Sequence, residues 1–141
     1  MHGLEAFIGE WTMGMEIPQA PQGRVLIDWM PGEQFIVERW DIPHPEAPDG
    51  IAIMGSHDGG ETLLQHYFDS RGVARVYDMG LENGVWTLSR TKPDFSPLKF
   101  WQRWSGTFSE DGRRIEGDWE TSNDEGATWE VDFHLTYTKV S

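Results

Sequence analysis

Three side-chain types that carry out acid–base chemistry occur within otherwise apolar, alternating stretches of this sequence. Glu38 lies in "GEQFIVERWDI", His66 in "LLQHYF" and Arg90 in "VWTLSR". A carboxylate or an imidazole can act as a general acid or base, and a guanidinium can stabilise negative charge that develops in a transition state. If the three groups share a pocket, His66 or Glu38 would be the base and Arg90 the charge stabiliser.

These side chains can meet only if strands direct them to one side of a sheet. Successive residues of a strand face opposite sides, and a polar group on the apolar side needs a partner in the protein or a ligand. Alternation therefore predicts a set of interior residues that would line a ligand pocket. They are Glu38, Trp40, His66, Phe68, Trp86, Arg90, Phe100, Gln102, Trp104, Phe133 and Tyr137.

Each polar member of this set also has a purely structural interpretation. Glu38 and Arg90 would pair with each other, and His66 would be a hydrogen-bonded core histidine. Gln102 would satisfy a backbone group at a bulge, and Tyr137 would place its hydroxyl in water at the rim. A register error of one residue would turn any of these side chains outward.

The stretch "LKFWQRWSGTF" (98–108) shows how alternation separates two faces. Gln102 and Trp104 fall on the predicted inner face, and Trp101 and Arg103 fall on the outer face. We expect Arg103 to cover Trp101 through a cation–π contact. Aromatic residues on the outer face, such as Trp101 and Trp29, would be exposed to water in a monomer. An interface between two copies of the chain would bury them, so we expect a homodimer.

Turn signals rich in Gly, Pro, Asn and Asp divide the chain into about ten segments of strand-like composition. This spacing predicts a single all-β domain over residues 1–141, an antiparallel up-and-down barrel whose closure removes exposed strand edges. Within "GLEAFIG" the spacing predicts one short helical turn near the N-terminus. The acidic stretch "SEDGRRIEGDWETSNDEG" lacks the ligand spacing of a calcium loop and is expected to be a hairpin.

The charge balance excludes several classes of partner. The 141 residues include 11 Lys and Arg against 24 Asp and Glu, a net charge of −13, which disfavours nucleic acid and anionic membranes. The absence of cysteine excludes disulfides and zinc–thiolate sites. No metal site or cofactor is expected, since no two histidines have metal-ligand spacing on one face. Without a recognisable secretory signal, a cytoplasmic location is the default expectation.

Several motifs together resemble the calycin superfamily, which includes lipocalins, fatty-acid-binding proteins and nitrobindins. "LEAFIGEWTMGMEI" is similar to the Gly-X-Trp opening of such barrels, in which the Trp, here Trp11, packs at one end under a basic residue of the last strand, here Lys139. "PGEQFIVERW" and "WSGTFSEDGRRIEGDWE" extend a resemblance to bacterial lipocalin-like domains of unknown function over most of the chain. His57 departs from the Gly-Tyr-Asp-like triplet usual at that corner.

The resemblance implies a ten-strand barrel with an internal cavity, but no agreed catalytic residues. The leading expectation is a barrel that binds a hydrophobic or aromatic small molecule. An enzyme of the cyclase, isomerase or hydratase type would use the same pocket. A nitrobindin-like haem protein would take a ligand from a late strand, where His134 lies on the predicted polar face. A lumen filled by aromatic side chains would leave a purely structural module.

Overall fold

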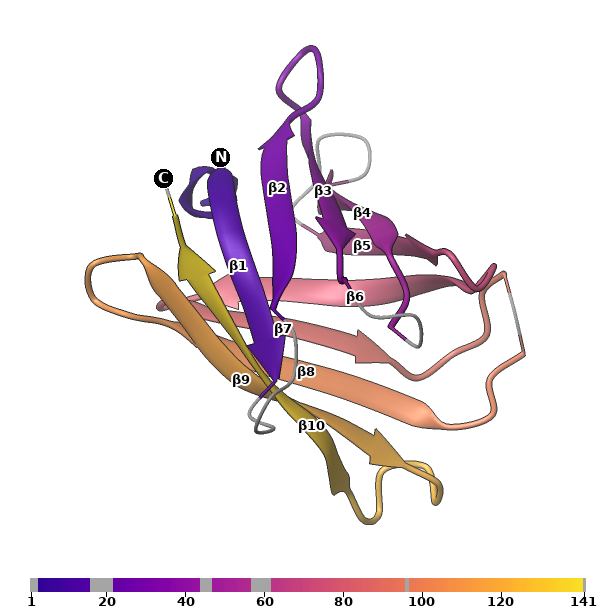
Figure 1. Ribbon diagram of the computed structural model, residues 1–141. Helices are drawn as coiled ribbons and strands as arrows, with labels where there is room; N and C mark the ends of the chain where they lie inside the picture. Colours follow the sequence, from indigo (N-terminus) through magenta and orange to yellow (C-terminus); the bar gives the residue numbers. More distant parts are fainter. Residues whose placement is uncertain (1–2, 16–21, 44–46, 57–61, 96, 141) are drawn as a thin grey trace.

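Tight turns carry the chain from each strand to the next, so strands that are neighbours in sequence are neighbours in space. In the computed structural model, which describes residues 3–15, 22–43, 47–56, 62–95 and 97–140, ten antiparallel strands follow a short 3-10 helix, η1 (Figure 1). The elements are η1 Leu4–Phe7, β1 Gly9–Met15, β2 Gly23–Trp29, β3 Phe35–Asp41, β4 Gly50–Ser56, β5 Leu63–Asp69, β6 Ala74–Glu82, β7 Val85–Arg90, β8 Trp101–Phe108, β9 Arg114–Ser122 and β10 Glu130–Lys139.

The sheet closes because the first and last strands pair with each other. β1 lies between β2 and β10, with Trp11 opposite Lys139 and Met13 opposite Tyr137. Figure 1 shows the start of β1 and the end of β10 close together at the end of the barrel that carries η1. Closure leaves no free edge in the sheet. The all-β, up-and-down barrel expected from the turn spacing is confirmed, as is the helical turn near the N-terminus.

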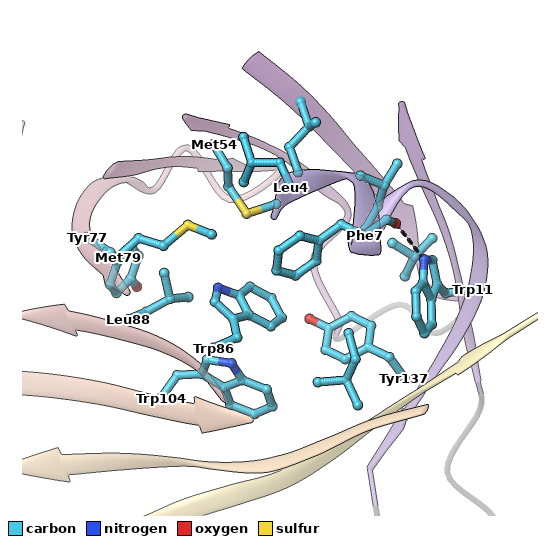
Figure 2. Packing of buried hydrophobic residues seen from close by; sticks show 14 of the residues in the cluster. Leu4, Phe7, Trp11, Met54, Tyr77, Met79, Trp86, Leu88, Trp104 and Tyr137 are labelled. Atoms are coloured by element: carbon cyan, nitrogen blue, oxygen red, sulfur yellow. Dashed lines mark hydrogen bonds between the residues drawn. The ribbon is translucent and has the colours of Figure 1, made fainter. Parts of the chain in front are cut away.

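The end of the barrel that carries η1 is filled by apolar side chains. Phe7 is fully buried, and its carbonyl oxygen accepts a hydrogen bond of 2.8 Å from the indole Nε1 of Trp11 (Figure 2). The ammonium group of Lys139 lies 5.5 Å from the centre of the Trp11 ring, within cation–π range. The packing of Trp11 under Lys139 that the family resemblance implied is therefore present.

An aromatic cluster runs from η1 into the middle of the barrel. Phe7 meets Trp86 edge to face at 4.9 Å, and Trp86 meets Trp104 at 5.5 Å between ring centres. Tyr137 closes the group, 5.8 Å from Trp86 and 6.3 Å from Trp104. Figure 2 shows these rings turned toward one another. Their burial supplies the main hydrophobic stabilisation of this half of the barrel.

Three side chains on the outer face or at strand ends lie differently from the sequence-based expectation. Alternation from Phe133 and Tyr137, both predicted inside, would also put Val131 inside, but the register of β10 shifts between Val131 and Phe133, and Val131 is 60% exposed. Such a bulge interrupts alternation. Trp29 was expected outside, yet it packs against the core. The guanidinium of Arg103 lies 4.0 Å from the centre of the Trp129 ring, and its predicted partner Trp101 is instead half-buried.

The two tryptophans that motivated the homodimer are therefore both at least partly covered within one chain. A β-carbon added at Gly126 would meet the Trp101 ring at 2.8 Å, so the loop between β9 and β10 packs on that ring. The homodimer stays a prediction. Within the described ranges, no helix is long or apolar enough to cross a membrane.

Candidate ligand site in the barrel

Most of the residues predicted to face the interior do so. Glu38, Trp86, Arg90, Gln102, Trp104 and Tyr137 are all buried. Trp40 and Phe133 are half-buried and pack against the core. In β3, β7, β8 and the second half of β10, strict alternation carries these side chains to the same side of the sheet. These directions were predicted correctly.

The predicted face of β5 was wrong. Gln65 is buried and lies opposite Met54 on β4 and Tyr77 on β6, which are both buried too. His66 therefore faces outward, and Phe68, 41% exposed, lies on the same outer side. In "LLQHYF" each face carries two large apolar or aromatic residues and one polar residue, so alternation alone does not distinguish the faces, and a one-residue error reverses every side chain.

Phe100 lies just outside the strand on which it was predicted. β8 begins at Trp101, and Phe100 precedes it at the end of the barrel opposite η1, which we call the mouth. The mouth is the end where β5 and β7 finish and β6 and β8 begin. The guanidinium of Arg75 lies 5.6 Å from the centre of the Phe100 ring. Phe100 therefore belongs to the mouth and not to the lumen wall.

Glu38 is a buried carboxyl group in the middle of β3. It is 4% exposed, and no described residue makes a hydrogen bond to its side chain. Burial raises the pKa of Glu38 from 4.5 to about 7, because the charged form loses its hydration. Burial also raises the pKa of Tyr137 well above its usual range, and the negative charge of Glu38 adds to that effect. The two side chains therefore share one region of the interior.

The predicted pair between Glu38 and Arg90 does not form. The Nε and NH2 groups of Arg90 donate to the two carboxylate oxygens of Asp94 at 2.8 and 3.0 Å. The backbone N–H of Val76 donates to the same carboxylate at 2.7 Å. Asp94 holds the pKa of the Arg90 guanidinium above its usual range through this hydrogen bond. Arg90 is thus engaged structurally, and Glu38 has no cationic partner among the described residues.

Three more buried polar atoms lack a hydrogen-bond partner among the described residues. They are the side-chain carbonyl oxygen of Gln65 and the indole nitrogens of Trp86 and Trp104. A buried donor or acceptor without a partner costs about 1–3 kcal/mol. Native proteins leave few such groups, and each one needs an explanation. Together with Glu38, these atoms offer two donors, one acceptor and one titratable carboxyl group to the interior.

Toward the mouth, the interior polar groups satisfy one another. The side-chain carbonyl oxygen of Gln102 accepts hydrogen bonds from Arg75 NH1 at 2.9 Å and from the Tyr77 hydroxyl at 3.1 Å. The Tyr67 hydroxyl donates to Asp69 at 2.6 Å, and burial raises the pKa of Tyr67. The barrel interior therefore has a paired polar layer near the mouth and an unpaired polar group deeper inside.

Sequence reasoning missed several residues of these two layers. Gln65 and Tyr67 were missed together with the face of β5. Arg75 and Tyr77 could have been found, since "ARVYDMGLE" alternates Arg, Tyr, Met and Leu on one face. Asp94 was missed although it lies only four residues after Arg90, because it stands in a loop where the alternation of a strand does not apply.

The described histidines lie outside the lumen. His134 is on the outer side of β10, with Nδ1 2.7 Å from Asp118 and Nε2 3.1 Å from Glu116. A haem in the lumen would therefore not receive His134 as its axial ligand. In the described part of the chain, no three His, Asp or Glu side chains form a metal-binding group. His2, His44 and His57 lie outside the described residues.

Comparison of the sequence with models of known protein families gives no match, and comparison with curated protein sequences gives no match either. What the interior offers chemically is a buried, titratable carboxyl group in the region of Tyr137, together with two unpaired indole donors and one unpaired amide acceptor on β5, β7 and β8.

Proposed function

We propose that this barrel binds a hydrophobic or aromatic small molecule inside its lumen. One observation carries the proposal: Glu38, Gln65, Trp86 and Trp104 place buried polar atoms in the interior without a described hydrogen-bond partner. A ligand that pairs with them would remove the cost of leaving them unsatisfied. Pockets that combine aromatic walls with a few polar groups are typical of small-molecule sites. A calycin-like family membership, as the sequence motifs suggest, would agree with this use of the barrel.

The unpaired atoms also define the ligand that would fit. Indole N–H groups only donate, so the ligand needs an acceptor such as a carbonyl or ring nitrogen near Trp86 or Trp104. Glu38 accepts when ionised and can donate when protonated, and its pKa of about 7 makes both forms accessible near neutral pH. A flat molecule with an apolar body and one or two neutral polar atoms meets these conditions.

The test is a titration of the intrinsic tryptophan fluorescence with neutral aromatic ketones and heterocycles, supported by native mass spectrometry of the freshly purified protein. We expect saturable quenching by at least one probe. Trp104→Phe removes one indole donor and should weaken that probe about three- to tenfold. His66→Gln, on the outer face, is the matched control and should leave affinity unchanged. No quenching by any probe, or equal loss in both variants, would contradict the proposal.

A second candidate function rests on Glu38 alone. A carboxyl group whose pKa lies near the working pH suits general acid–base catalysis, because both protonation states are populated. An isomerase or hydratase would use Glu38 to move a proton on a ligand held in the lumen. This mechanism does not use His66 or Arg90, because His66 faces outward and Arg90 is bound to Asp94. If Glu38→Gln retains turnover of a molecule recovered from the purified protein, this candidate is wrong.

A further inference from the structure

A depression of about 310 Å³ opens to solvent at the mouth of the barrel. Its walls come from the start of β6 and from the loop between β7 and β8. The residues that matter for its chemistry are Arg75, Arg90, Lys99, Phe95, Pro97 and Phe100. Three cationic side chains thus line a small, largely apolar depression on a chain whose net charge is −13.

Two of these three cations have no carboxylate partner among the described residues. Arg90 is bound to Asp94, with the closest N–O distance at 2.8 Å. Arg24, Arg71, Lys92, Arg103 and Arg114 each lie within 4.0 Å of an acidic side chain elsewhere on the surface. Arg75 and Lys99 form no such ion pair with any carboxylate of the described residues. In a chain with more than twice as many acidic as basic residues, their charge is available to a ligand.

Arg75 is held in place by neutral groups. It projects from the inner face of β6, opposite Tyr67 on β5. One of its nitrogens donates to the Gln102 side chain at 2.9 Å, and its guanidinium lies over the Phe100 ring at 5.6 Å. These contacts fix the orientation of the group without neutralising its charge. A guanidinium fixed in this way is preorganised for a planar, two-oxygen anion.

We infer that this depression binds the carboxylate of a small ligand with an aromatic or branched apolar body. Phe95, Pro97 and Phe100 supply apolar surface for the body, and Arg75 and Lys99 supply the charge for the head group. The adjacent Asp94 carboxylate would repel a doubly charged phosphate more strongly than a singly charged carboxylate. The depression lies at the mouth, so this inference goes beyond the lumen proposal and does not depend on it.

The experiment uses the complete chain and 2-naphthoate, with its neutral isostere 2-naphthamide and with phenyl phosphate as comparison probes. Affinity is measured by isothermal titration calorimetry, and the location by amide and indole N–H chemical shifts. We expect naphthoate to bind with shifts at Gly72, Val73 and Ala74, and naphthamide to bind at least about tenfold more weakly. Shifts confined to the Trp86 and Trp104 indoles would instead report binding in the lumen, and would contradict the mouth site.

Three substitutions separate the site from general charge effects. Arg75→Gln should weaken naphthoate about 10- to 100-fold, because a charge-assisted hydrogen bond is lost. Lys99→Gln, at an exposed side chain, should weaken it about two- to fivefold without risk to folding. Arg113→Gln makes the same charge change at the opposite end, where Arg113 bonds the Lys139 carbonyl, and should have less than about a twofold effect.

Two further results would overturn the inference. Equal losses in Lys99→Gln and Arg113→Gln would show a general charge effect and no site. Tighter binding of phenyl phosphate than of naphthoate would overturn the assignment to a carboxylate. Neither result depends on whether neutral probes enter the lumen, so the two proposals succeed or fail separately.

Discussion

At the scale of single residues, Glu38 is the side chain whose pKa burial moves into the neutral range. A carboxyl group on an exposed strand would ionise near pH 4.5, but burial raises the pKa of Glu38 to about 7. No described cation or hydrogen bond stabilises its charged form. The folded protein therefore holds a proton on Glu38 that the unfolded chain releases at lower pH, and folding stability depends on pH through this group.

Through Glu38, the free energy of unfolding decreases as pH rises. Between pH 4.5 and 7 the folded state binds more protons than the unfolded state, so stability falls as pH rises and levels off above 7. The full effect is about 3 kcal/mol, of which about 2 kcal/mol lies between pH 5.5 and 8.5. Glu38→Gln should remove this contribution. Urea unfolding of both proteins at pH 5.5 and 8.5 measures it, with the exposed Glu82→Gln as control. A difference between Glu38→Gln and wild type that is equal at both pH values would contradict the prediction.

At the scale of elements, the loop between β7 and β8 is attached to the barrel mainly through Asp94. Its carboxylate joins the Arg90 guanidinium at the end of β7 to the backbone N–H of Val76 on β6. Both charged side chains are nearly inaccessible, at 2% and 7%. A buried pair of this kind depends on both partners, because removing one leaves the other charge buried and uncompensated.

Asp94→Ala should therefore destabilise the fold by about 3–5 kcal/mol. Asp78→Ala is the matched control, since Asp78 makes a solvent-exposed ion pair of 3.8 Å with Lys92 and should cost less than about 1 kcal/mol. Chemical denaturation of the two variants beside the wild type gives both values. Similar losses of unfolding free energy in the two variants would show that the buried Asp94 pair contributes no more to stability than an exposed ion pair. Hydrogen exchange at Val76 should accelerate only in Asp94→Ala.

At the scale of the whole molecule, the net charge of −13 acts against the compact state. Closing ten strands into a barrel brings 24 acidic side chains closer together than they are in the unfolded chain. The ion pairs on the outer face offset part of this repulsion, but only six of the 11 basic residues lie within 4.0 Å of an acidic side chain among the described residues.

Salt should therefore stabilise this protein. Raising sodium chloride from low to moderate concentration screens repulsion between exposed charges, so the unfolding midpoint should rise. A variant with Glu82, Glu110 and Glu130 each changed to Gln has three fewer negative charges at exposed positions and should show a smaller rise. Thermal unfolding followed by circular dichroism measures both slopes. A midpoint that falls with salt would indicate that attractive ion pairs outweigh the repulsion.

The directions of individual side chains were predictable where one face of a strand is clearly apolar. In β7, Trp86 and Leu88 mark the inner face, and Arg90 follows them inward. In β8, Trp104 marks it, and Gln102 follows. In β5 both faces carry large apolar residues, so Gln65 was missed and His66 was placed inside. Only the pairing of β5 with β4 and β6 decides its register, and that pairing is not visible in one strand alone.

By itself, the sequence determined the class of fold and the up-and-down order of the strands, because turn residues and alternation act over a few neighbouring positions. The tertiary structure alone decided which polar groups meet. It brought Gln102 to Arg75 and Tyr77, left Glu38 without a partner among the described residues and gathered Arg75 and Lys99 around one depression at the mouth. Those outcomes depend on distances between residues on different strands and loops, and closure of the barrel sets these distances.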